Sequence, residues 1–345
     1  MERRPARQRM ALRAIAGRVA SLLFLSLAFQ PVSSRADAVA DFYRGRTVTI
    51  VIGAGEGGFY DGSGRLMAQH LRKYLPGNPT VIAQNMPGAS QLRATEHAAN
   101  IAPRDGSSLL VVQPNVILNK LLNRDLRFEI ARMSYIGRVA PIEMGGIVAD
   151  KAPARTFEDA RRTEVIFGGN AANGPASMIP WALNRLAGTR FRVILGYPSQ
   201  SAEELAIQRG EIQGIGNGSI NEIMGKETKR VLYASGLQRF AAYPDAPSIM
   251  EVTREEERPV MALLASVPDV GLTLMGPPDI PADRLAALRA AFDQMVRDPA
   301  YLEGLSRQRF AAAPMSGERL AAFVAERFSA PESLIERLRA ATAQP

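Results

Sequence analysis

The chain has 345 residues, 46% of them hydrophobic, and carries a formal net charge of +8 with no cysteine and two histidines. Without cysteine it can form neither a disulfide framework nor a thiol nucleophile, and His70 and His97 alone are a poor basis for a metal cluster or a Ser-His-Asp set. The length fits two domains with sizeable cores.

The N-terminal segment has the pattern of a secretory signal peptide. Six arginines precede the apolar run VASLLFLSLAF at 19–29, and an A-x-A cleavage pattern ends at Ala38. The alternative, a membrane anchor, needs ~20 apolar residues. We therefore expect residues 1–38 to be a cleaved signal peptide and the mature protein to be periplasmic.

Removal of this segment changes the charge of the protein. Seven arginines against Glu2 and Asp37 give residues 1–38 a net charge of +5, so the value of +8 falls to +3 in the mature chain. The isoelectric point near 10.0 then reflects targeting rather than a nucleic-acid-binding surface. We expect no nucleic-acid partner.

Downstream, β-rich apolar runs alternate with helical patterns. Apolar residues at helical spacing predict helices within 66–75 and 285–296, and later amphipathic helices are predicted around 320–328 and 334–338. The expected strands are 46–52, 79–84, 108–113, 164–169, 191–197, 230–235 and 270–276. This alternation predicts parallel sheets flanked by helices.

The first strand is followed by a glycine-rich loop with two interpretations. Gly53, Gly55 and Gly58 fit the dinucleotide fingerprint G-x-G-x-x-G. That site also needs an acid at the end of the second strand, where this chain has Gln84 and Asn85, so we expect no cofactor. The loop instead suits a small anion, held by free N–H groups and by a helix starting near Asp61, with Asp61 as its N-cap. The alternative is that the glycines only make a tight turn.

Four further polar, glycine-rich loops share this setting. Each is expected at the carboxyl end of a strand, where open α/β sheets bind ligands. They span 84–91, 167–177, 196–204 and 214–219. Together the five loops indicate one binding edge.

Six blocks, in order, resemble the solute-binding receptors of tripartite tricarboxylate transporters, the TctC or Bug family. They are GGFYDGSGR (57–65), PGNPTVIAQNMPGAS (76–90), APRDGSSLL (102–110), GYPSQSAEELAIQRGEI (196–212), YPDAPSIMEV (243–252) and GPPDIPADRLAALRAAFDQMVRDP (276–299). The resemblance covers nearly all of the mature chain.

The resemblance implies an α/β, two-lobed periplasmic-binding-protein (Venus flytrap) fold, each lobe a mostly parallel sheet flanked by helices. Lobe 1 would comprise 39–143 plus 266–345, and lobe 2 would comprise 144–265. We expect the late amphipathic helices, around 320–328 and 334–338, to dock back onto lobe 1. It also implies a monomeric receptor, not an enzyme, that closes on a small carboxylate and delivers it to membrane transporter subunits.

The family pattern also implies which positions hold the ligand, with no metal or cofactor. In lobe 1 these are Gly58, Phe59, Tyr60 and Asp61 of the first loop and Gly88, Ala89, Ser90 and Gln91 of the second. In lobe 2 they are Asn170, Asn173, Ser177, Ser199 and Asn217.

Several positions depart from the family pattern. The opening GAGEGG lacks two prolines and adds Glu56, which we expect to face solvent. Ser90 adds a hydroxyl, and Asn217 stands where an acid is common, which disfavours ligands with an ammonium group. Phe59 and Tyr60 either stack on an aromatic ligand or pack against the neighbouring lobe; we favour packing.

Two other classes of protein stay open. An exported enzyme would need an activated nucleophile or paired acids, for which the sequence offers no convincing set. A partner or sensor-associated protein of the same fold is compatible with the unusual GAGEGG loop and with Ala172 and Asn173. The sequence does not identify the ligand, nor decide between transport and sensing.

Overall fold

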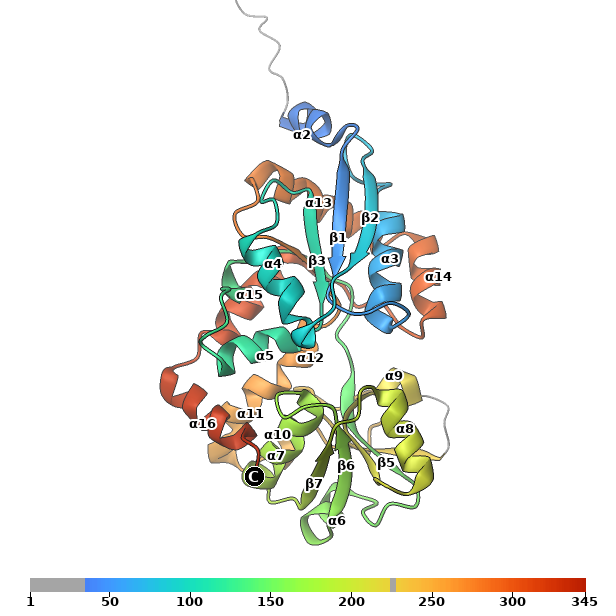
Figure 1. The fold of residues 1–345 in the computed structure, drawn as a ribbon, viewed down its shortest axis with the longest axis vertical. Coiled ribbons are helices and arrows are strands. Elements are labelled where there is room, and N and C mark those ends of the chain that lie inside the picture. The colour runs from blue at the N-terminus through green and yellow to red at the C-terminus, as the bar shows by residue number, and fades with distance from the viewer. Residues whose placement is uncertain (1–34, 224–227) are drawn as a thin grey trace, which may run out of the picture.

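The computed structural model describes residues 35–223 and 228–345, which form two lobes, one above the other in Figure 1. The expected signal peptide therefore lies outside the described residues, except for its last residues, which begin helix α2 (Arg35–Tyr43). Within the described ranges, no helix has the length and apolar character needed to cross a bilayer.

The first lobe is built on a six-stranded sheet of order β11-β4-β10-β3-β1-β2. Its strands are β1 (Thr47–Ile52), β2 (Thr80–Asn85), β3 (Ser108–Val112), β4 (Ser134–Arg138), β10 (Thr273–Gly276) and β11 (Met315–Ser316). Strand β1 pairs in parallel with β2 and β3, whereas β10 runs antiparallel to β3 and β4.

The second lobe contains a five-stranded sheet of order β7-β6-β8-β5-β9. Its strands are β5 (Met144–Ala149), β6 (Val165–Gly169), β7 (Phe191–Leu195), β8 (Gly214–Ser219) and β9 (Lys229–Ala234). Strand β6 pairs in parallel with β7 and β8, and β5 runs antiparallel to β8 and β9.

Both sheets are mixed, which corrects the expectation of mostly parallel sheets while confirming the two-lobed α/β fold. The antiparallel pairs involve the strands next to the lobe crossings. The chain leaves the first sheet after β4 to form β5 and re-enters it as β10, so β10 and β5 run against their neighbours.

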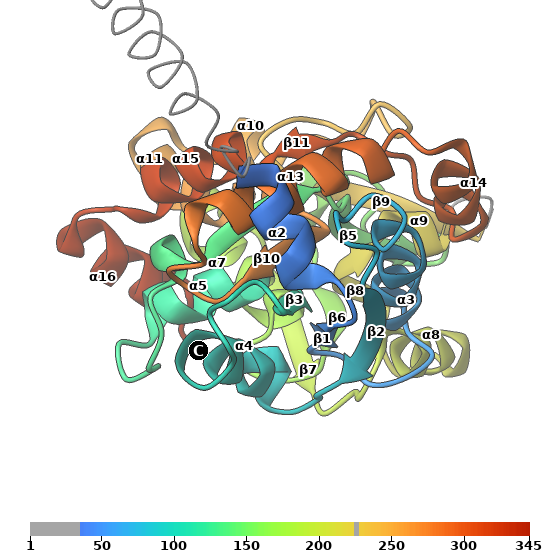
Figure 2. The ribbon, with the colours of Figure 1, turned by 90° about the horizontal axis from the view of Figure 1, so that it is seen from above.

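Helices cover both faces of the first sheet, which explains why β1 is apolar at successive positions. Val48, Ile50 and Ile52 are buried in one core cluster and Val51 in another, because neighbouring side chains of a strand point to opposite faces. The first cluster includes residues of α2, α3 (Phe59–Leu71), α13 (Ala282–Met295) and α14 (Pro299–Arg307). The second includes residues of α4 (Leu92–Asn100), α5 (Asn115–Leu122) and α15 (Gly317–Phe328). Figure 2 shows α2 beside α13, at the end of this lobe remote from the other.

The second sheet has a large core on one side and a smaller one on the other. The large cluster centres on Phe167, Tyr233 and Leu183, and the smaller one on Ile147 and Ile215. The helices of this half are α6 (Phe157–Arg162), α7 (Pro175–Ala187), α8 (Gln200–Arg209), α9 (Ile220–Ile223), α10 (Ile249–Val252), α11 (Arg258–Ala265) and α12 (Val267–Val270). Single-turn 3-10 helices lie at η1 (Ala89–Gln91), η2 (Ile130–Arg132) and η3 (Glu255–Glu257).

The last helix, α16 (Glu332–Thr342), does not dock as expected. Helix α15 packs on the first lobe, but Leu338 and Ala341 of α16 are buried with α7 and α11 in the core of the second lobe. Arg185 of α7 donates to the carbonyl of Ala341 at 2.9 Å. The apolar face of α16 therefore completes the other core. The lobe boundaries at 143/144 and 265/266 remain a prediction.

The segment 214–219 is a strand, not the expected glycine-rich loop. A Cβ on Gly214 would lie 2.3 Å from the carbonyl oxygen of Ile147, and one on Gly216 would lie 2.2 Å from that of Ala176. The glycines therefore allow close packing of β8 against β5 and α7, and they do not mark a turn. Strands β4 and β5 were also absent from the expected set.

Candidate functional site

A cavity of about 1190 Å³ lies between the two lobes. On the first lobe its wall comes from residues within 54–62, 113–118 and 308–310. On the second lobe the wall comes largely from residues within 170–179 and 197–221. The volume accommodates a small organic molecule together with water.

The first glycine-rich loop leads into α3, whose N-terminus opens on the cavity. Helix α3 begins at Phe59 with Gly58 as its N-cap, and no side chain caps it. Gly58, Phe59 and Tyr60 all line the cavity. Because the first N–H groups of a helix have no intrahelical partner, this end presents open donors and a partial positive charge.

Asp61 is not the N-cap that the sequence suggested. It lies in the first turn of α3, and its buried carboxylate accepts hydrogen bonds from the Gly57 amide (2.9 Å), Arg65 Nε (2.9 Å) and Asn85 Nδ2 (2.8 Å). Burial opposes ionisation of Asp61, but the bonds from Arg65, Gly57 and Asn85 outweigh it and lower its pKa to about 2. Asp61 thus shapes the loop from behind the cavity wall.

The two aromatic residues pack within their own lobe and also line the cavity. The Phe59 ring lies 4.7 Å from that of Phe310 and 5.3 Å from that of Tyr60. Both residues are half-buried against the first core, and burial raises the pKa of the Tyr60 hydroxyl. Their packing partners are therefore not in the neighbouring lobe. Ligand contact by either ring stays a prediction.

The second loop lies beside the cavity wall rather than in it. Ala89, Ser90 and Gln91 are all left-handed, with φ of 47°, 53° and 72°. The buried Gln91 side chain accepts a hydrogen bond from the Gln113 amide at 2.9 Å, while Gly88, Ala89 and Ser90 are exposed. The loop thereby holds the end of β3, and Gln113 itself lines the cavity.

Three more helices begin at the cavity. Helix α5 follows Pro114 and α7 follows Gly174, and neither has a side-chain cap. Helix α8 is capped by Ser199, whose hydroxyl accepts from the Ala202 amide at 3.2 Å. Pro114, Pro175 and Ser199 all line the cavity. Two helix N-termini from each lobe thus converge on one space, an arrangement that favours an anion.

Three amide side chains on the wall each have a buried atom without a hydrogen-bond partner among the described residues. These atoms are Oδ1 of Asn115, Nε2 of Gln200 and Oδ1 of Asn217. Asn217, predicted from the sequence, lies on β8 and is 8% exposed. Since buried polar atoms are normally bonded, these three point to a polar guest or bridging water.

The other residues predicted in the second lobe have separate positions. Asn170 lines the cavity, with its Oδ1 accepting from the Ala171 amide at 2.8 Å. Ser177 is buried behind the wall and donates to the carbonyl of Ala171 at 2.9 Å. Asn173 is exposed and lies off the wall. Ser177 therefore fixes the shape of the loop that carries Asn170.

The charged groups on the wall are few and unevenly placed. Among the described residues that line the cavity, Arg309 is the one Lys or Arg, and it follows α14 with a left-handed φ of 59°. Glu56 is exposed, as expected, but lies on the cavity wall. Glu203 and Glu204 line the other side, and Glu204 pairs with Lys229 at 3.1 Å.

Three residues of the wall were not predicted from the sequence: Asn115, Gln200 and Arg309. Asn115 follows β3 directly, so the rule that ligands bind at the carboxyl ends of strands could have indicated it. Gln200 lies inside one of the predicted loops. Arg309 follows a helix far along the chain, and no local signal connects it to the cavity. In residues 35–223 and 228–345, no group of three acidic or histidine side chains could hold a metal ion.

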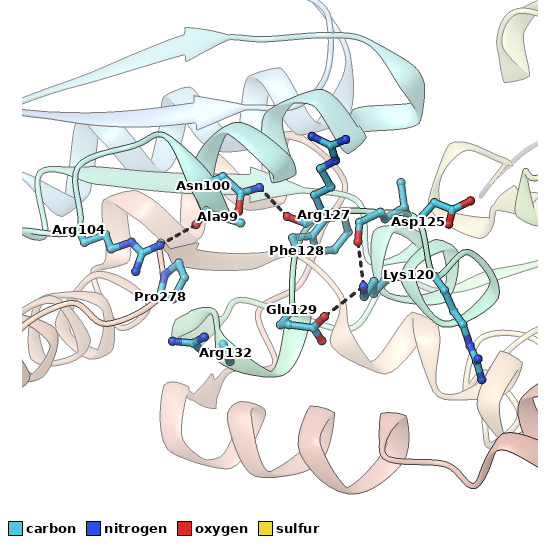
Figure 3. Close-up of a pocket in the computed structure, with 12 residues that line it drawn as sticks. Ala99, Asn100, Arg104, Lys120, Asp125, Arg127, Phe128, Glu129, Arg132 and Pro278 are labelled. Atoms are coloured by element: carbon cyan, nitrogen blue, oxygen red, sulfur yellow. Dashed lines mark hydrogen bonds and ion pairs between the residues drawn. The ribbon is translucent and has the colours of Figure 1, made fainter.

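A second, smaller pocket of about 410 Å³ lies on the first lobe (Figure 3). It is rich in cations, but Arg104 and Arg132 each pair with Asp279 at 3.1 Å, and Lys120 pairs with Glu129 at 3.2 Å. Its lining comes from the first-lobe segments 99–132 and Pro278. A guest there could not bridge the lobes, so the larger cavity is the candidate site.

Two α/β lobes that enclose a cavity lined by helix N-termini from both sides are the architecture of the two-lobed periplasmic-binding-protein fold. Residues 64–339 match the profile of the tripartite tricarboxylate transporter family receptor, TctC. The chain therefore belongs to the TctC family, which confirms the resemblance found in the sequence. The family is one of receptors that serve tripartite transporters.

Known relatives and structures agree with this assignment. A UPF0065 protein of Bordetella bronchiseptica is 28% identical over 291 residues, covering 81% of this chain and 80% of the relative. A TctC solute-binding protein from Polaromonas, solved without ligand, superposes with a TM-score of 0.65 at 19% identity over 86% of this chain and 99% of that one. MatC of Rhodopseudomonas palustris, solved with bound malate, superposes with a TM-score of 0.63 at 17% identity, covering 86% of this chain and 99% of MatC. These structural likenesses establish the fold.

Proposed function

We propose that this protein captures a small carboxylate in the cavity between its lobes and delivers it to a tripartite tricarboxylate-type membrane transporter. The observation that carries the proposal is the convergence of the N-termini of α3, α5, α7 and α8 on one cavity. Backbone amides at helix N-termini bind anions well. MatC, which shares the fold, was solved with malate.

Capture requires a ligand that touches both lobes. A carboxylate held by α3 and Arg309 on one side and by α7, α8 and Asn217 on the other would favour the closed state, because only that state makes both sets of contacts. Closure removes water from the charge, so donors must surround it. Gln200 supplies a donor in its unpartnered Nε2, whereas the unpartnered Oδ1 atoms of Asn115 and Asn217 are acceptors that suit a ligand hydroxyl or a bridging water.

Thermal unfolding of the mature chain with a panel of mono-, di- and tricarboxylates tests this function. A ligand at about 100 times its Kd adds about 2.7 kcal/mol to the free energy of unfolding, which raises Tm by about 5 °C for a protein of this size. Non-carboxylate sugars at equal concentration are the control. If no carboxylate raises Tm, the receptor proposal fails and a partner or sensor-associated role becomes the better account.

We infer that the protein works in the periplasm as a monomer, without catalytic activity. The support is the sequence pattern of residues 1–38 and membership of a receptor family. Fractionation followed by N-terminal sequencing should place the mature protein in the periplasm, beginning near residue 39. Light scattering should give the mass of one chain. A cytoplasmic, uncleaved or dimeric protein would contradict the corresponding part.

A further inference from the structure

Among the described residues, the buried Glu203 on the cavity wall has no hydrogen-bond or ion-pair partner for its carboxyl group. Glu203 lies in the first turn of α8, lines the cavity and is only 5% exposed. No described residue donates a hydrogen bond to its carboxyl or forms an ion pair with it, whereas the neighbouring Glu204 pairs with Lys229. A buried, unpartnered acid next to a binding cavity is unusual, because burying a charge without a partner is unfavourable.

Within residues 35–223 and 228–345, the elements around Glu203 supply no compensating cation. Its stem lies against β6, since a Cβ on Gly168 would be 3.0 Å from Glu203 Cγ. Strand β8 contributes the amide of Asn217 to the same wall. Burial, Glu211 and Glu203 itself raise the pKa of the nearby Tyr197.

The other charged residues near the cavity are Lys229, Glu56 and Arg309, which are distant from Glu203 in the sequence. The Lys229 ammonium is engaged by Glu204. Across the cavity, the first lobe offers Glu56 and Arg309. Burial therefore dominates and raises the pKa of Glu203 to about 7. Below that pH the group is a neutral carboxylic acid, which can donate a hydrogen bond; above it, the group only accepts.

We propose that Glu203 takes up one proton from solvent when a carboxylate enters the cavity, and donates that proton as a hydrogen bond to the ligand. The inference rests on the proposed function. It follows because the incoming negative charge disfavours ionised Glu203, while the protonated acid gives the anion an additional donor inside the second lobe. Glu203 would thereby select ligands with a carboxylate that reaches α8.

Calorimetric titration of the mature protein with malate and with other dicarboxylates tests this coupling. At about pH 8, titration in buffers of different ionisation enthalpy should show uptake approaching one proton per ligand. Kd should weaken by up to about tenfold per pH unit between about pH 7 and pH 8.5, as proton linkage requires.

Two variants identify the proton acceptor. Glu203→Gln keeps an amide donor but cannot titrate, so it should bind with a nearly pH-independent Kd and without proton uptake. Glu211→Gln removes an acid from an exposed position close by, and it should keep the uptake. Should Glu203→Gln fail to fold, the buffer dependence of the natural protein still decides the question.

The possible failures are distinguishable. Binding of a dicarboxylate with no proton uptake, or uptake that persists in Glu203→Gln, overturns the role of Glu203 and leaves the receptor function intact. Absence of binding by the natural protein to every dicarboxylate at about pH 6 overturns the receptor function, and the coupling falls with it.

Discussion

The carboxylate of Asp61 is engaged by the preceding loop, by its own helix and by the end of β2. Hydrogen bonds from Gly57, Arg65 and Asn85 hold it behind the N-terminus of α3. Its function is therefore to position the amides of Gly58 to Tyr60, which do line the cavity. A residue that the sequence placed among ligand contacts is in the structure a support for those contacts.

We expect Asp61→Asn to destabilise the protein by about 2 kcal/mol at neutral pH. The pKa of Asp61 is lowered from 3.8 to about 2 in the folded state, so its contribution is present above pH 3.8 and is lost as the pH falls through about 2. Urea unfolding at about pH 7 and about pH 3 should therefore show a smaller difference between variant and natural protein at the lower pH. An equal difference at both would contradict the assignment.

Arg309 gives a second prediction at the scale of single residues. As the one cation on the described cavity wall, it should strengthen carboxylate binding through a charge-assisted hydrogen bond. Arg309→Gln should weaken Kd about tenfold without changing Tm of the free protein. Arg307→Gln, which removes an exposed cation paired with Glu303 on α14, is the matched control. Equal losses in both variants would show that only long-range charge matters.

Strand β8 shows how one element serves both packing and the site. Its glycines admit the first turn of α7 so closely that a Cβ on Gly216 would lie 2.2 Å from the carbonyl oxygen of Ala176 and 2.6 Å from Pro180 Cγ. The hydroxyl of Tyr233 also donates to the carbonyl of Gly216. Because Asn217 follows directly, this contact sets where its amide meets the cavity.

Gly216→Ala should therefore displace α7 and destabilise the protein by about 2–3 kcal/mol, as overpacking does. Ala176 and Pro175 line the cavity, so ligand affinity should fall as well. The control is Gly236→Ala, where the added Cβ would meet no atom closer than 3.6 Å. Chemical denaturation together with calorimetric titration would check both effects, and a variant with natural stability would refute the packing argument.

Local sequence patterns predicted most of the strands but not the glycine-rich strand β8. The seven expected strands correspond to β1, β2, β3, β6, β7, β9 and β10, because each is an apolar, β-branched run between turn residues. Strand β8, with three glycines, carries no such signal, because its glycines are required by the close approach of α7 and β5 and not by a local turn. The second loop depends on left-handed Ala89, Ser90 and Gln91, a conformation that these residue types do not indicate.

The candidate site was predictable where it follows strands. Gly58, Phe59, Tyr60, Asn170, Ser199 and Asn217 all lie on the cavity wall, and most of them lie where the loop rule puts them. Arg309 could not be predicted, because tertiary packing of α14 brings it to the cavity. Glu203 lies within a predicted loop, but nothing in the sequence shows that its side chain is buried and lacks a partner among the described residues.

At the scale of the molecule, α16 ties the chain end to the second lobe. Arg339 donates from Nε to the carbonyl of Leu122 at 3.1 Å, and Leu338 is fully buried among α7 and α11. The helix therefore contacts α5 of the first lobe as well as the core of the second. The residues between α15 and α16 form a third passage of the chain between the lobes, in addition to those at 139–143 and near 271–272.

Leu338→Ala should lower the free energy of unfolding by about 2–5 kcal/mol, the usual effect of truncating a buried leucine. Ser333→Ala, on the exposed side of the same helix, should change stability by less than about 0.5 kcal/mol. Thermal or urea unfolding of both variants would measure this. A negligible effect of Leu338→Ala would mean that α16 is not part of the second core.

The contacts of α5 and α16 also distinguish the two edges of the cavity between the lobes. Leu118 of α5 is buried in the core of the second lobe and lines the cavity floor with Leu264 and Val267. We expect the lobes to hinge at that edge, so the cavity should open on the opposite edge, between the end of α14 and the start of α8. A ligand with a long chain would have to extend out of the cavity through that opening. The distance between fluorophores on α8 and α14 should therefore change most when the lobes close.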